Sequence, residues 1–151
     1  MQTKPAPPFA LPSSKGEIVR LSDILASGRH AVVYFYPKDD TPGCTAEACS
    51  FRDEYTAFQD AGADVIGISM DDAASHQAFA AKQNLPFTLL SDADGSVARA
   101  FGVKKTLGLI PGRETFIISP SGQIIHRFSS QFNPKRHIRE ALEFLQNQGT
   151  R

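Results

Sequence analysis

The chain has two cysteines, Cys44 and Cys49, and they lie five positions apart in the stretch PKDDTPGCTAEACSF. If the stretch after Gly43 is a helix, a five-residue step rises about 7.5 Å and leaves the two Cα atoms roughly 8.6 Å apart. A disulfide needs Cα atoms within about 7 Å of each other. Either the two cysteines are unrelated, or they bond only after the helix between them unwinds. In the second case the helix would act as a redox switch.

The residues around Cys44 are of types that could activate it. A cysteine attacks as the thiolate, so a reactive cysteine needs neighbours that stabilise the anion. Pro42 and Gly43 precede Cys44 at a predicted helix start, where unpaired N–H groups and the helix dipole favour negative charge. Thr41 offers a hydroxyl that can hydrogen-bond to the sulfur or to an oxygen bound beside it. Arg113 is the best placed distant cation, provided that its strand neighbours the strand before Cys44.

Each of these residues also has a purely structural interpretation. A cysteine in an apolar helix is commonly a small buried hydrophobe. Thr41 and Pro42 would then be turn residues, Arg113 a solvated loop residue, and Pro37 the end of a strand. Taken singly, these residues leave the inert and the reactive interpretation of Cys44 both open.

The hydrophobic pattern predicts the elements that would position the cysteines. Residues 31–36 are apolar throughout, which is typical of a strand buried on both faces of a parallel sheet. Further strands are predicted at 63–70 and 87–90, hairpins at 9–21 and 114–129, and helices at 22–25, 44–61, 72–84, 95–101 and 133–145. This alternation predicts an α/β fold with a mixed central sheet and helices on both faces. Such sheets carry their sites at the carboxyl ends of strands, where Cys44 lies.

Length and composition fit one soluble domain, residues 1–151. The 16 basic and 16 acidic side chains give a formal net charge of zero, which argues against nucleic acid as a partner. The apolar runs are too short to cross a bilayer. The N-terminal residues lack the pattern of a secretory signal, so a cytoplasmic location is predicted. In a reducing compartment a lone pair of cysteines is more often catalytic or inert than a permanent bridge.

Other polar residues show no arrangement that indicates a second site. The four histidines are scattered over different predicted elements, namely His30, His76, His126 and His137. None has zinc-ligand spacing with the cysteines, so solvated surface positions are predicted for them. The paired aspartates 39–40 and 71–72 are interpreted as loop residues and helix caps.

Taken together, Pro37, Thr41 and Cys44 resemble the active-site signature of the peroxiredoxins, which is Pro, three residues, Thr or Ser, two residues, Cys. The following TAEAC is similar to the bacterioferritin comigratory protein or peroxiredoxin Q subfamily, whose second cysteine lies five residues on, here Cys49. The segment GRETF resembles the one that carries the family's essential arginine, which places that role on Arg113. The opening PPFALPSSKGEIVRLSD is also similar, so the resemblance covers nearly the whole chain.

The resemblance implies a thioredoxin-like fold and a peroxidase that reduces hydrogen peroxide and organic hydroperoxides without a metal or organic cofactor. Cys44 would be the peroxidatic nucleophile and would become a sulfenic acid. Cys49 would resolve it by forming an intramolecular Cys44–Cys49 disulfide. Thioredoxin or a similar dithiol protein would then reduce the enzyme. The chain is expected to be a monomer or a weak homodimer.

Two other functions compete with a peroxidase. A general disulfide reductase would have two cysteines separated by two residues at a helix start, whereas four residues separate Cys44 and Cys49. A redox-sensing or chaperone-like interaction module would use the same cysteines to expose a binding surface. Such a module needs a single oxidation, whereas a peroxidase turns over, so an assay of peroxide consumption separates the two.

Overall fold

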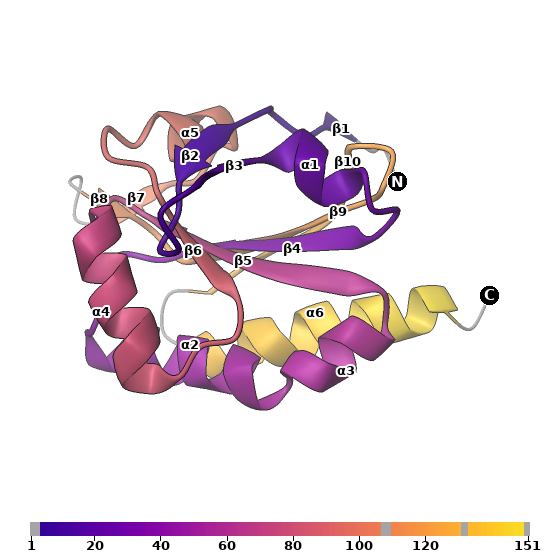
Figure 1. Ribbon diagram of the computed structural model, residues 1–151. Coiled ribbons are helices and arrows are strands. Elements are labelled where there is room, and N and C mark those ends of the chain that lie inside the picture. Colours follow the sequence, from indigo (N-terminus) through magenta and orange to yellow (C-terminus); the bar gives the residue numbers. More distant parts are fainter. Residues whose placement is uncertain (1–3, 107–109, 131–132, 150–151) are drawn as a thin grey trace.

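A computed structural model describes residues 4–106, 110–130 and 133–149. A mixed six-stranded sheet forms its centre (Figure 1). In spatial order its strands are β1 (Lys4–Pro5), β10 (Gln123–Ser129), β9 (Glu114–Ile118), β4 (His30–Phe35), β5 (Ala63–Ser69) and β6 (Thr88–Ser91). The pairs β4–β5 and β5–β6 are parallel, and the other pairs are antiparallel. The predicted mixed sheet is therefore confirmed.

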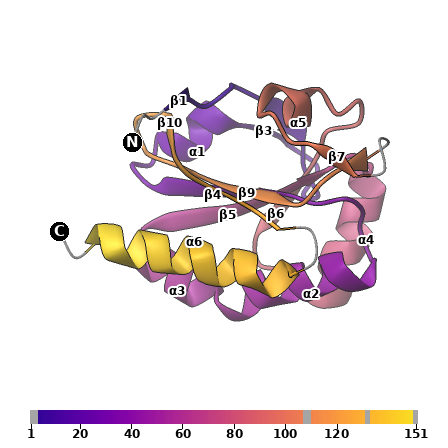
Figure 2. The ribbon, with the colours of Figure 1, turned by 180° about the vertical axis from the view of Figure 1, so that it is seen from behind.

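Helices cover both faces of the sheet, as predicted. One face carries α2 (Pro42–Asp53), α3 (Tyr55–Asp60), α4 (Ala73–Gln83) and α6 (Pro134–Gly149). The other carries α1 (Leu21–Leu25), α5 (Ser96–Ala100) and the hairpin of β2 (Ala10–Pro12) and β3 (Ile18–Arg20). Figure 2 shows α6 running beneath the sheet beside α2 and α3. Among the described residues, no helix has the length and apolar character needed to span a membrane.

Strand β4 is apolar almost throughout because both of its faces are buried. Val32 and Tyr34 pack into the core on the side of α2 and α6, whereas Val33 and Phe35 pack into the core on the side of α1 and α5. All four are at most 1% exposed. Successive side chains of a strand point to opposite faces, so a strand covered on both faces has no polar position.

The helix predicted at 44–61 is instead two helices, and that prediction was wrong in this respect. α2 ends at Asp53, and Glu54 has a backbone conformation (φ −102°, ψ 10°) outside the helical range. Neither glycine nor proline marks the break. Phe51 and Phe58 are both fully buried and pack together across it, with ring centroids 5.5 Å apart.

Three short strands were not predicted. These are β1 and the pair formed by β7 (Lys105–Thr106) and β8 (Ile110–Pro111). A strand of two residues has no periodicity for a sequence pattern to detect. The remaining predicted elements are confirmed, with ends that differ by a few residues; α6 runs on to Gly149.

Candidate active site

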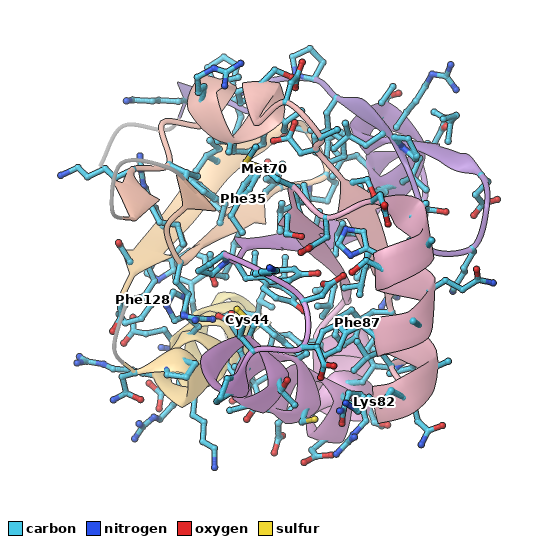
Figure 3. All side chains as sticks on the ribbon, turned by 90° about the vertical axis from the view of Figure 1, so that its left-hand side faces the viewer. Phe35, Cys44, Met70, Lys82, Phe87 and Phe128 are labelled. Carbon is cyan, nitrogen blue, oxygen red and sulfur yellow. The ribbon has the colours of Figure 1, made fainter. Side chains whose placement is uncertain are left out.

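Cys44 lies in the first turn of α2, below the carboxyl end of β4 (Figure 3). The helix begins at Pro42. Proline suits this position because the N–H of a first helical residue has no partner within the helix, and because the ring fixes φ at a helical value. As the third residue, Cys44 has one of the backbone N–H groups that have no acceptor within a helix. Its side chain is only 1% exposed, and its thiol is free. The buried sulfur therefore lies at the positive end of the helix dipole.

Strand pairing brings Arg113 to this sulfur from 69 positions along the chain. β9 pairs antiparallel with β4, with Glu114 opposite Phe35, so the residue before β9 lies beside the carboxyl end of β4. The Nη2 atom of Arg113 is 3.6 Å from the Cys44 sulfur. The space for this guanidinium depends on Gly43, because a Cβ there would lie 3.0 Å from Nη2.

Glu47 holds the guanidinium in place, and the sequence analysis missed it. Its Oε1 accepts a hydrogen bond of 2.6 Å from Nη1 of Arg113. Glu47 is fully buried and Arg113 is 6% exposed. Glu47 is three residues after Cys44, on the same side of α2, and this spacing was the available signal.

The charges of this pair follow from its burial. Burial raises the pKa of Glu47 to about 8, although the Arg113 guanidinium acts to lower it. For Arg113, burial acts to lower the pKa, but the charges of Glu47 and Cys44 outweigh it and hold the pKa above its usual value. Arg113 is therefore cationic at neutral pH, and its positive charge faces the sulfur.

His137 is buried beside Glu47, so the surface position predicted for it was wrong. Its ring is fully buried, and its Nδ1 is 3.8 Å from Oε2 of Glu47. Nε2 faces the Ser130 carbonyl at 2.8 Å and must donate to it, so Nδ1 accepts from the Thr115 hydroxyl at 2.8 Å. Burial lowers the pKa of His137 to about 4, and the ring is neutral at pH 7.

Thr41 and Pro37 lie on the loop between β4 and α2. Thr41 has the extended backbone of an N-cap residue (φ −96°, ψ 154°), and its carbonyl accepts from Thr45 N–H. Its hydroxyl donates to the Lys38 carbonyl at 3.0 Å, which leaves its oxygen lone pairs able to accept from a molecule beside the sulfur. Pro37 is half-buried two residues after the last residue of β4.

Buried hydrogen bonds fix this loop to α4, and the full burial of His76 overturns the surface position predicted for it. Asp39 accepts hydrogen bonds from Tyr36, Ser75 and His76, the last at 2.7 Å. Nε2 of His76 lies 2.9 Å from the Leu90 carbonyl, so both ring nitrogens face oxygen atoms. These hydrogen bonds hold the pKa of Asp39 below its usual value, against the raising effect of burial.

Of the two other paired aspartates, Asp71 also holds the loop, whereas Asp72 caps α4. Asp71 accepts from the backbone N–H of Asp39 at 2.8 Å, and Asp72 caps α4 through Ser75 N–H, as predicted for a cap. Asp39, Asp71 and His76 are the group of described residues with metal-ligand spacing, since their donor atoms lie within 4.8 Å of one another. Because hydrogen bonds already engage these atoms, the group acts as an anchor for the loop.

Cys49 lies on the same unbroken helix as Cys44. The expected Cα separation of about 8.6 Å between the two cysteines therefore applies. It is half-buried and its thiol is free. Its sulfur donates a hydrogen bond of 3.3 Å to Oε1 of Gln83, the last residue of α4. An intact α2 keeps the two cysteines too far apart for a disulfide.

Comparisons with known proteins identify the family of this chain. Residues 3–127 match the AhpC/TSA family. A chloroplastic peroxiredoxin Q of Triticum aestivum is 49% identical over 142 residues, which are 93% of this chain and 64% of that relative. The chain thus spans less than two thirds of the length of that relative.

Solved structures are similar over almost their whole length. The peroxidoxin BcpB of Mycobacterium tuberculosis has a TM-score of 0.89 and 38% identity, with 96% of each chain covered. The bacterioferritin comigratory protein of Xanthomonas campestris, whose structures concern alkyl peroxide reduction, has a TM-score of 0.83 and 36% identity, covering 93% of this chain and 91% of that one. The predicted thioredoxin-like fold is thereby confirmed. The chain belongs to the AhpC/TSA family and, within it, to the peroxiredoxins of the peroxiredoxin Q and bacterioferritin comigratory protein type.

Proposed function

We propose that the chain is a thiol-dependent peroxidase that reduces hydrogen peroxide and organic hydroperoxides. The observation that carries this proposal is the buried Cys44 sulfur in the first turn of α2, with a guanidinium nitrogen of Arg113 3.6 Å away. Family membership and the alkyl peroxide reduction named for the Xanthomonas campestris relative support it.

In the first step the Cys44 thiolate attacks one oxygen of the peroxide. A sulfur–oxygen bond forms, the oxygen–oxygen bond breaks, and the leaving oxygen takes a proton to become water or an alcohol. Cys44 becomes a sulfenic acid. The leaving oxygen gathers negative charge, and preorganised donors stabilise such charge. We assign this role to Arg113 and the Cys44 N–H, and we assign to the Thr41 hydroxyl the binding of the peroxide. Pro37 positions the loop that presents them.

In the second step Cys49 attacks the sulfenic sulfur, and the intramolecular Cys44–Cys49 disulfide forms with loss of water. The first turns of α2 must unwind for the sulfurs to meet. Thioredoxin or a similar dithiol protein then exchanges with this disulfide and restores both thiols. A reducing, cytoplasmic location and a monomeric or weakly dimeric state stay predictions; the Triticum aestivum relative is chloroplastic.

Substituting each cysteine separates the two roles. Cys44→Ser should abolish peroxide consumption, whereas Cys49→Ser should react once with peroxide and stop as a sulfenic acid. Peroxide consumption with and without thioredoxin, together with intact mass, measures both outcomes. Turnover at the wild-type rate in Cys44→Ser would refute the assignment. A wild-type protein that oxidises once but does not turn over with any dithiol reductant would instead support the redox-sensing module.

A further inference from the structure

Cys49 is held in place by contacts to a different helix. Its S–H donates to Oε1 of Gln83 at 3.3 Å, and Nη1 of Arg52 donates to the backbone carbonyl of Gln83 at 2.8 Å. Arg52 follows Cys49 by three positions, so both lie on the side of α2 that faces the end of α4. We call Cys49, Arg52 and Gln83 the resolving cluster.

Gln83 has a fixed position because α4 ends there. Asn84 adopts a left-handed conformation (φ 53°, ψ 49°), and the next residue, Leu85, is buried. The last carbonyls of a helix have no partner within the helix and form its negative end. The Arg52 guanidinium satisfies one of them and brings a positive charge to that end. The backbone of Gln83, whose side-chain amide accepts from Cys49, is therefore held by Arg52.

This contact opposes the second step of the proposed reaction. To resolve the sulfenic acid, Cys49 must lose its proton and move toward Cys44, since an intact helix leaves their Cα atoms about 8.6 Å apart. The acceptor at 3.3 Å holds the Cys49 sulfur against the end of α4. The hydrogen bond from a thiol is weak, so the Cys49 sulfur can leave Gln83 when the turns of α2 between the two cysteines unwind.

We propose that Gln83 is a positioning residue that restrains the resolving thiol Cys49 and thereby sets how fast the disulfide forms. The proposal rests on the proposed peroxidase function. Its consequence concerns damage: while Cys44 waits as a sulfenic acid, a second peroxide can oxidise it to a sulfinic acid and itself become water or alcohol. A slower release of Cys49 lengthens that wait, so Gln83 also sets the sensitivity of the enzyme to excess peroxide.

Two substitutions at Gln83 should change the rate in opposite directions. Gln83→Ala removes the acceptor, so disulfide formation should be about two- to tenfold faster, the effect of losing one net hydrogen bond. Gln83→Glu offers an anionic acceptor that disfavours the Cys49 thiolate and pairs with Arg52, so formation should be slower by a similar factor. Gln77→Ala, an exposed glutamine on the same helix, is the matched control. A merely structural role would not give changes of opposite sign.

The experiment mixes each reduced protein with one equivalent of hydrogen peroxide, quenches the reaction at intervals and counts sulfenic and disulfide forms by intact mass. A second series with excess peroxide counts the sulfinic acid, which should decrease in Gln83→Ala and increase in Gln83→Glu. Oxidation of Cys44 itself should keep the wild-type rate in all variants. Unchanged disulfide rates in both Gln83 variants would overturn this proposal and leave the peroxidase function standing. A wild-type Cys44 that peroxide does not oxidise would refute the function itself.

Discussion

At the scale of single residues, the site depends on the guanidinium of Arg113, which makes two contacts at once. One nitrogen pairs with Glu47 and the other faces the Cys44 sulfur. A planar guanidinium with several donors in fixed directions suits these two contacts better than the single ammonium nitrogen of a lysine. Burying a charge is costly unless it is paired, so Glu47 makes a buried guanidinium tolerable beneath the sulfur.

Arg113→Ala should slow the reaction of Cys44 with peroxide by about 10²–10³, the usual cost of removing one charged donor from a developing oxyanion. The fold should survive, because burial raises the pKa of Glu47 to about 8, so that the carboxyl is neutral at pH 7 and loss of Arg113 leaves no unpaired charge there. Stopped-flow measurement of Cys44 oxidation gives the rate. The exposed Arg139 on α6 supplies the control, Arg139→Ala, which should react at the wild-type rate. Equal rates in all three proteins would show that Arg113 is not part of the reaction.

At the scale of elements, α2 has to be stable when reduced and yet able to unwind. The loop before it is fixed to α4 by the Asp39–His76 pair and by the exposed salt bridge from Lys82 to Asp40. After it, the break at Glu54 separates α2 from α3. We infer that the break lets α2 unwind without carrying α3, whose Phe58 is fully buried.

Amide hydrogen exchange should show this local unwinding. We expect faster exchange from Thr41 to Arg52 in the disulfide form than in the dithiol form, with the strands of the central sheet and α3 unchanged. Mass spectrometry must show that the bond joins Cys44 and Cys49 within one chain. If exchange in this segment is the same in both forms while that bond is present, α2 does not act as a redox switch.

At the scale of the whole molecule, α2, α6 and the sheet meet at the buried groups beneath Cys44. His137 has a folded-state pKa of about 4, against an ordinary value of 6.5. Between these values the unfolded chain binds the proton and the folded chain does not. Stability from a neutral His137 is therefore fully present above pH 6.5 and is lost as the pH falls toward 4. Glu47, with its pKa raised to about 8, acts in the opposite direction between pH 4.5 and 8.

Comparing the wild type with His137→Asn separates the two effects. The difference in free energy of unfolding between them should grow by up to about 1.4 kcal/mol per pH unit from pH 4 to 6.5 and stay constant above that. Urea titrations at a series of pH values measure it. A difference that does not vary with pH over this range would mean that His137 is not held neutral by the fold.

Local patterns in the sequence were enough to predict most elements of this chain. A strand that is apolar at every position, a proline at a helix start and a stripe of Ile138, Leu142 and Leu145 each express a local rule of backbone and burial. The register of Pro37, Thr41 and Cys44 is local too. The spacing of the two cysteines, combined with helix geometry, already required unwinding before a disulfide could form.

Only the tertiary structure decided which distant groups surround the two sulfurs. The pairing of β9 with β4 places Arg113 beside Cys44, and the position of the end of α4 against α2 places Gln83 beside Cys49, from 34 positions away. Burial of Glu47, His76 and His137 was equally unpredictable, because a charged or polar residue becomes a core residue only when partners from other elements satisfy it. Such partnerships depend on which faces meet in space, and periodicity along one segment carries no information about that.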